Sequence, residues 1–147
     1  MKSELNKIRV DKSNAYKIGR MIEDICDKYN LHNYFGLIST TVAYAGNIVL
    51  SALNDDERII FTFNQCIGGV SFSLKSERNI FENLDFNIDY TSQSPELIIK
   101  MLTNEVYIQQ EGKELEMVFY VNGIEPAQLL TRQDKLKTYF KKNLVKN

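Results

Sequence analysis

A chain of 147 residues is long enough for one domain with its own hydrophobic core, and its 44% apolar and 25% charged residues are typical of a globular protein rather than a disordered one. The formal net charge of −1 gives no overall attraction to nucleic acid or to an anionic membrane, so neither is expected as a partner. The first residues show neither the apolar stretch of a signal peptide nor a lipidation pattern, so we expect a cytoplasmic protein.

The first part of the chain predicts a short strand and an amphipathic helix. Residues 7–10 favour a strand, and the polar residues 11–14 can cap the helix that follows. Apolar residues then recur at helical spacing from Ile18 to Tyr29, with charged residues between them. This pattern predicts a helix with one side in the core and the other in water.

The stretch from Gly36 to Leu53 contains no charged residue. Its length is close to the lower limit for spanning a bilayer, but five Ser, Thr and Asn residues within it favour a helix buried inside a soluble domain. At a period of 3.6, small residues fall along one side of this helix, and four of them are candidate site residues: Thr40, Ala43, Asn47 and Ser51. On a buried helix, such a stripe predicts the wall of a cavity.

The second part of the chain predicts two hairpins separated by a helix. Strands near 58–64 and 70–74 are expected to turn at two glycines, and strands near 106–108 and 115–121 to turn around Gly112. Residues 75–93 show no clear periodicity, which is typical of a lid, a binding loop or a mobile segment. Ser94 and Pro95 then mark a helix start.

These elements predict an α+β domain: a two-layer sandwich with a mostly antiparallel or mixed sheet that three helices cover on one face. The whole chain, 1–147, is expected to be a single domain. Residues 1–124 form the sandwich in this prediction, and 125–147 form a C-terminal amphipathic helix whose polar faces are basic.

The order of elements, the segment Val-Ala-Tyr-Ala-Gly-Asn-Ile-Val-Leu-Ser-Ala at 42–52, and the segment Leu-Thr-Asn-Glu-Val-Tyr-Ile at 102–108 resemble the histidine-kinase-like ATPase fold. Within that fold, the chain up to about residue 121 is most similar to the small anti-sigma-factor serine kinases of bacteria. A helix of this family carries Glu-x-x-x-Asn, in which the Glu activates a hydroxyl or water and the Asn holds magnesium. The resemblance therefore implies a nucleotide site beside the uncharged helix.

The site motifs of the family are mostly missing from this chain. Asn47 matches the magnesium ligand, but Ala43 occupies the position of the catalytic Glu. Ser76 falls where the adenine-binding Asp-x-Gly-x-Gly turn is expected, and Ser94 and Pro95 where the glycine-rich phosphate loop is expected. The resemblance thus implies Thr40, Ala43, Asn47, Ser51, Ser76 and Ser94 as nucleotide-pocket candidates and Asn47 as the metal candidate.

Three functions follow from this pattern. The first is a non-catalytic regulatory or protein-interaction domain that has lost its ATP site, uses no cofactor and binds a protein partner. The surface that binds the partner is expected on the first helix, on residues 75–93 or on the C-terminal helix. A homodimer is a further alternative. The second is an active ATP- and Mg-dependent serine kinase in which Glu77 or Glu82 replaces the missing carboxylate. The third is an unrelated α+β domain that binds a small ligand beside Thr40, Asn47 and Ser51.

Overall fold

The structure, a computed structural model, describes residues 6–87 and 94–121. The predicted closing helix at 125–147 lies outside these residues. In chain order, the elements are β1 (Lys7–Val10), α1 (Lys17–Lys28), η2 (His32–Tyr34), α2 (Phe35–Ala52), β2 (Ile59–Cys66), β3 (Gly69–Lys75), α3 (Pro95–Leu102), β4 (Glu105–Gln109), η3 (Gln110–Gly112) and β5 (Glu114–Phe119). The prediction of an α+β protein is confirmed.

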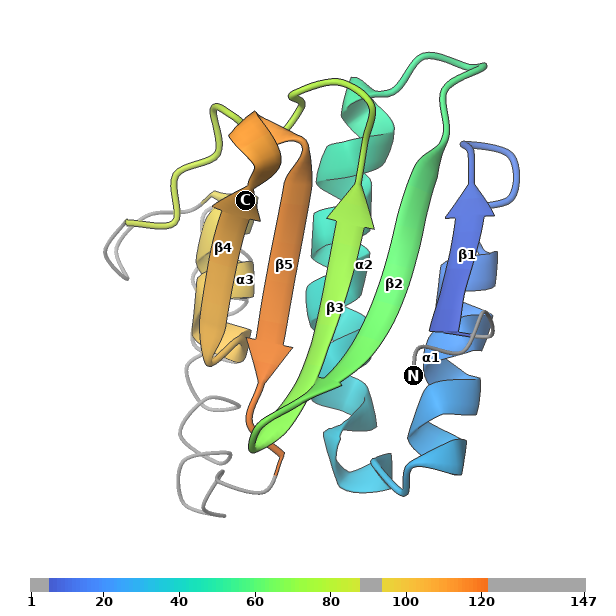
Figure 1. Cartoon of the computed structure of the whole chain (residues 1–147), viewed down its shortest axis with the longest axis vertical. Helices are drawn as coiled ribbons and strands as arrows, with labels where there is room; N and C mark the ends of the chain where they lie inside the picture. Colours follow the sequence, from blue (N-terminus) through green and yellow to red (C-terminus); the bar gives the residue numbers. More distant parts are fainter. Residues whose placement is uncertain (1–5, 88–93, 122–147) are drawn as a thin grey trace, which may run out of the picture.

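The five strands form one sheet in the order β1-β2-β3-β5-β4, and each pair of neighbours is antiparallel. Figure 1 shows α1, α2 and α3 behind this sheet, on the same face. The two-layer arrangement is therefore as predicted. The alternative of a mixed sheet does not apply to the described strands, because every pair of neighbours among them is antiparallel.

The core lies between the sheet and the helices. Side chains of a strand alternate between faces, so Phe61 and Phe63 of β2 point to the same side, and Phe63 pairs with Phe72 of β3. The rings of Phe72 and Phe119 then meet edge to face, with their centroids 6.0 Å apart. All four rings are fully buried, and burying each contributes about 1.5–3 kcal/mol to folding. These aromatic residues pack across β2, β3 and β5 and form the surface on which the helices pack.

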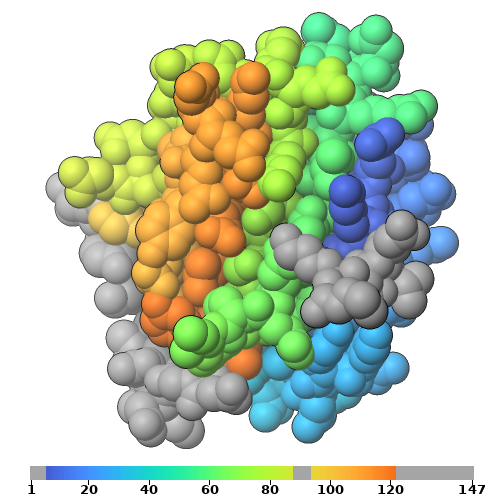
Figure 2. All heavy atoms as spheres, viewed as in Figure 1, coloured from blue at the N-terminus to red at the C-terminus, as the bar shows by residue number. Residues whose placement is uncertain are grey.

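The other face of the sheet is turned toward the viewer in Figure 2, and most of its side chains are polar. One row across this face runs from Lys7 through Thr62, Ser73 and Glu116 to Tyr107. Basic side chains lie on its β1 side and acidic ones on its β5 and β4 side. The described part of this face therefore carries charge of both signs.

The connection between β3 and α3 was expected to be a lid, a binding loop or a mobile segment. Its described part, 76–87, packs against the end of the sheet. Phe81 is 0% exposed, and its backbone N–H donates to the carbonyl of Gly112 over 2.9 Å. Gly112 has a φ of +87°, which favours glycine at this turn. This buried ring fixes the middle of the connection to the core.

Candidate functional surface on the second helix

The uncharged helix α2 has one buried and one exposed side. Ile38, Thr41, Ala45 and Val49 are buried on the side that faces the sheet. The opposite side, however, lies open to solvent: Gly36, Ala43, Asn47 and Ser51 are exposed and Thr40 is half-buried. The prediction of a helix enclosed on both sides, with this stripe as the wall of an internal cavity, is therefore wrong.

Two hydroxyl groups of α2 are bound within the helix itself. Thr41, which is buried, donates to the carbonyl of Leu37 over 2.7 Å, and the exposed Ser51 donates to the carbonyl of Asn47 over 2.6 Å. Such bonds to the preceding turn satisfy a hydroxyl without a further partner.

A groove of about 310 Å³ separates α1 from α2. Its walls are largely apolar, with Ile22 from α1 and Val42 and Leu50 from α2. A methyl group added at Gly19 or at Gly46 would meet no atom within 4 Å. Small residues thus leave open space between the two helices, and Ala43 and Asn47 lie at the edge of that space.

The exposed charged residues of α1 do not line this groove. Its first turns carry the exposed cations Lys17 and Arg20, and its second half carries the exposed carboxylates Glu23, Asp24 and Asp27 before Lys28. The guanidinium of Arg20 lies 5.2 Å from the centroid of the Tyr16 ring, and Tyr16 is 60% exposed at the groove. The exposed charges of α1 are therefore basic in the first turns, acidic in the second half and basic again at Lys28.

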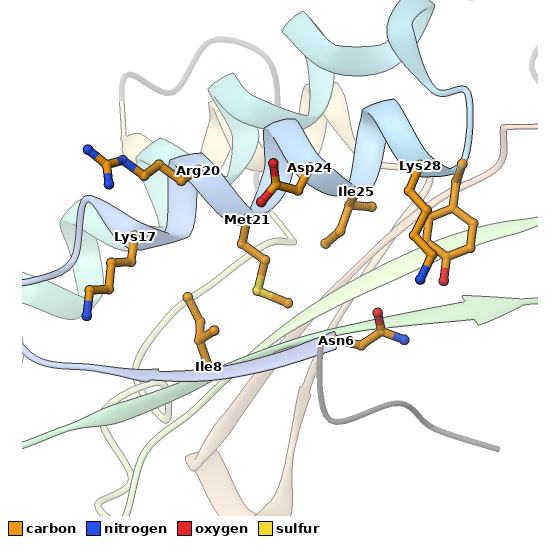
Figure 3. Close-up of a pocket in the computed structure, with 9 residues that line it drawn as sticks. Asn6, Ile8, Lys17, Arg20, Met21, Asp24, Ile25 and Lys28 are labelled. Carbon is orange, nitrogen blue, oxygen red and sulfur yellow. The ribbon is translucent and has the colours of Figure 1, made fainter.

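A second pocket, of about 340 Å³, lies between α1 and β1. In Figure 3, Met21 and Ile25 of α1 point toward β1, where Ile8 faces them, while Lys17 and Arg20 lie near the start of the helix. This pocket has an apolar floor and a charged rim, and it contains none of the six predicted site residues.

A third pocket, of about 580 Å³, lies at the end of the sheet where β3 finishes. Ser76 and Glu77 line it beside three cations, Arg9, Arg58 and Lys75. Asp56 and Glu57 also line it, so that three carboxylates offset the three cations. The pocket is polar without a dominant sign of charge.

The structure does not bring the six predicted residues together. Thr40, Ala43, Asn47 and Ser51 share the outer side of α2, whereas Ser76 lines the pocket at the sheet end and Ser94 is the N-cap of α3. Of the two replacement carboxylates, Glu77 lines the sheet-end pocket, and Glu82 accepts a hydrogen bond from the Asn79 amide over 2.6 Å. Neither lines the groove beside Asn47.

The surroundings of Asn47 do not fit a magnesium ion. Mg²⁺ sites in proteins favour carboxylates and phosphates, and no residue lining the groove is acidic. Within 6–87 and 94–121, no group of three or more His, Cys, Asp or Glu residues is placed to hold a metal.

By fold and surface, the described chain is an α+β domain with an antiparallel sheet covered by helices, one of which exposes an uncharged side. No family model, curated protein or solved structure matches the chain. The resemblance to the histidine-kinase-like ATPases therefore has no support from these comparisons and stays a prediction from the sequence pattern.

The segment His32–Ala52 is long and apolar enough to cross a membrane, with a mean hydropathy of 1.4. One such helix is weak evidence, because the core helix of a soluble protein passes the same test. Here 33% of the tested window is buried, on the side that faces the sheet. The remainder includes the exposed stripe described above.

Proposed function

We propose that this chain is a non-catalytic regulatory or interaction domain that binds a protein through the outer face of α2, defined as Gly36, Thr40, Ala43, Asn47 and Ser51 together with the groove beside α1. The observation that carries the proposal is that this face is exposed and yet uncharged, in a chain that is 25% charged. The solvent side of a surface helix normally carries charged residues.

The shape of the face also suits a protein partner. A contiguous weakly polar surface beside an apolar groove is typical of an interaction site, because a side chain of the partner can be buried in the groove. The 310 Å³ groove is large enough for such an anchor. Backbone atoms of a partner can also approach closely where Gly19 and Gly46 leave open space.

The non-catalytic part of the proposal rests on the separation of the candidate groups. General acid–base catalysis needs its groups within hydrogen-bond reach of one reacting atom. Asn47 lies on the groove and Glu77 on the pocket at the sheet end, so these two groups do not share a cavity.

Site-specific photo-crosslinking in the producing cell tests the proposed surface. We expect a benzophenone side chain at position 47 to give discrete protein adducts, because Asn47 is exposed on the outer face of α2. The same group at Tyr107, an exposed position on the polar face of the sheet, is the matched control. Ala43→Glu should abolish the adducts at position 47, since it places a carboxylate where a weakly polar partner surface packs. Equal adducts at both positions, or none at position 47, would reject the proposal.

Two further measurements separate the proposal from its rivals. Titration calorimetry with ATP and magnesium should show no heat of binding at millimolar nucleotide; micromolar binding that disappears in Asn47→Ala would instead support a kinase. Flotation with neutral phosphatidylcholine vesicles should leave the protein unbound. Flotation that Ala43→Glu prevents would show that lipid, not protein, covers the outer face of α2.

A further inference from the structure

We infer that the pocket between α1 and β1 binds an extended acidic segment of a partner protein, which adds to the sheet as a further strand beside β1. This pocket shares no lining residue with the groove between α1 and α2. The inference therefore concerns a second surface, goes beyond the proposed function and does not depend on it.

The backbone of β1 provides the first part of the site. Within 6–87 and 94–121, β1 pairs with β2 on one side and with no strand on the other. An edge strand presents backbone N–H and C=O groups that a further strand can pair. Figure 1 shows α1 behind this edge, so an added strand would have a helix on one face and solvent on the other. In such strand addition, backbone hydrogen bonds supply affinity and pockets for alternate side chains supply specificity.

The pocket of about 340 Å³ selects an apolar side chain. Its floor is made by Ile8 of β1 and by Met21 and Ile25 of α1, which point toward each other in Figure 3. Directly opposite residues of paired strands lie on the same face of the sheet. The residue of the added strand that lies opposite Ile8 therefore points toward α1 and enters this pocket.

The open face of β1 selects acidic side chains. Lys7 and Arg9 alternate with Ile8 and are exposed on the face away from α1. The residues of the added strand that lie opposite them share that face, and opposite charges in such pairs are stabilising. The expected segment is therefore acidic, apolar and acidic at three successive positions.

The rim of the pocket favours the same sign of charge. Three cations and one carboxylate line it: Lys17, Arg20, Lys28 and Asp24. In Figure 3, Lys17 and Lys28 extend toward β1 on either side of Met21 and Ile25, while Arg20 points away from β1. The other exposed carboxylates of α1, Glu23 and Asp27, do not line the pocket. The rim therefore has a surplus of positive charge, which attracts an acidic segment.

The charges of β1 also disfavour a second copy of this chain at the same edge. Two sheets that join at β1, with the helices of both copies on one face, pair open-face residues only with open-face residues. Lys7 or Arg9 of one copy would then lie opposite Lys7 or Arg9 of the other. Like charges directly opposite are destabilising, and charged side chains on an edge strand prevent self-pairing. The acidic segment of a different protein meets no such barrier.

Nuclear magnetic resonance of the isotope-labelled full chain locates the site with a probe peptide. The probe is Gly-Thr-Glu-Leu-Glu-Thr with both ends blocked, in which the two acidic residues flank one apolar residue. We expect the largest shift changes at the amides of Lys7, Ile8 and Arg9 and along α1. Replacing the leucine of the probe by serine should weaken binding about ten- to a hundredfold, because a buried apolar side chain is lost.

Methylation of the probe backbone tests strand addition itself. The N–H groups of successive residues in a strand point to opposite edges, so only every second N–H can donate to β1. N-methylation of the leucine alone, or of the two acidic residues alone, should abolish binding in one case and preserve it in the other. Equal effects of the two modifications would show that the peptide does not add as a strand, and would overturn the inference.

A charge reversal on the protein completes the test. Lys7→Glu should weaken binding of the probe about three- to tenfold, because an attractive pair becomes repulsive. Lys113→Glu is the matched control, since it makes the same change at an exposed position at the start of β5 and should leave binding unchanged. Circular dichroism checks that both variants keep the fold.

Three results would overturn the inference. The first is the absence of binding at millimolar probe, and the second is equal weakening by Lys7→Glu and Lys113→Glu. The third is a set of shift changes confined to the outer face of α2, which would move the peptide to the surface of the proposed function. The first two results leave the proposed function untouched, because photo-crosslinking at position 47 reports on a different surface.

Discussion

Glu57 and Arg78 join two loops at one end of the molecule. The guanidinium of Arg78 donates to both carboxylate oxygens of Glu57, through Nε and a terminal nitrogen, each over 2.6 Å. The same terminal nitrogen donates to the carbonyl of Ala52, at the last turn of α2, over 2.8 Å. A cation suits this end of a helix. The pair thus ties the connection after β3 to the end of the helix that carries the candidate surface.

This ion pair predicts a loss of stability in acid. Hydrogen bonds from Arg78, and then from the backbone N–H of Asn54, lower the pKa of Glu57 from 4.5 to about 2. A group whose pKa is lower in the folded state stabilises the protein above its unfolded pKa, and this contribution disappears as the pH falls from about 4.5 to about 2. Glu57→Gln should therefore reduce the free energy of unfolding at pH 6 and flatten its dependence on pH in this window.

Urea unfolding at a series of pH values measures this effect. Asp55→Asn is the control, because it removes a neighbouring, fully exposed carboxylate that does not contact Arg78. An unchanged acid dependence in Glu57→Gln would show that the pair contributes nothing measurable.

Phe81 provides a second prediction at the scale of one residue. Its ring is fully buried although it belongs to neither a helix nor a strand. Phe81→Ala should lower the free energy of unfolding by about 3–5 kcal/mol, because it removes a buried ring and leaves a cavity. Phe86→Ala, in the same connection but half-buried, should cost clearly less. Chemical denaturation of both variants gives the comparison, and equal losses would contradict the anchoring role of Phe81.

At the scale of elements, two glycines are expected to respond in opposite ways to the same substitution. A Cβ at Gly69, where β3 begins, would lie 2.1 Å from the carbonyl oxygen of Phe119 on β5. Gly69→Ala should therefore force the strands apart and destabilise the protein by about 1–3 kcal/mol. Gly19→Ala on α1 meets open space and should stabilise it by about 0.5–1 kcal/mol through helix propensity. Thermal unfolding tests both, and a stabilised Gly69→Ala variant would refute the close approach of β3 and β5.

Most of the elements could be predicted from local patterns. Helical spacing identified α1, the charge-free run identified α2 as a helix, and the glycine and proline positions identified both hairpins and the start of α3. The burial of Phe81 could not be predicted, because the surrounding apolar residues follow no period. The order β1-β2-β3-β5-β4 also depends on contacts between strands far apart in sequence, which periodicity does not encode.

The candidate surface was only half predicted, for a related reason. Spacing placed Thr40, Ala43, Asn47 and Ser51 on one side of a helix, which the structure confirms. Spacing does not say what lies against that side. The absence of charged residues from 36–53 was interpreted as full burial, whereas in the described part of the chain one side of this helix is exposed to solvent. The missing information concerns the surroundings of the helix, which only the tertiary structure supplies.

At the scale of the whole molecule, the strand order has a consequence for how fast the chain folds. Each hairpin, β2–β3 and β4–β5, closes a short loop, whereas the seam between β3 and β5 joins Leu74 to Leu115, about forty positions away. Contacts between residues far apart in sequence slow the folding of small proteins. The pairing of β3 with β5 is therefore the expected rate-limiting step of folding, and the two hairpins are expected to form before it. The β3–α3 connection is part of the chain between β3 and β5. Its anchor at Phe81 therefore shortens the loop that must close before these two strands can pair.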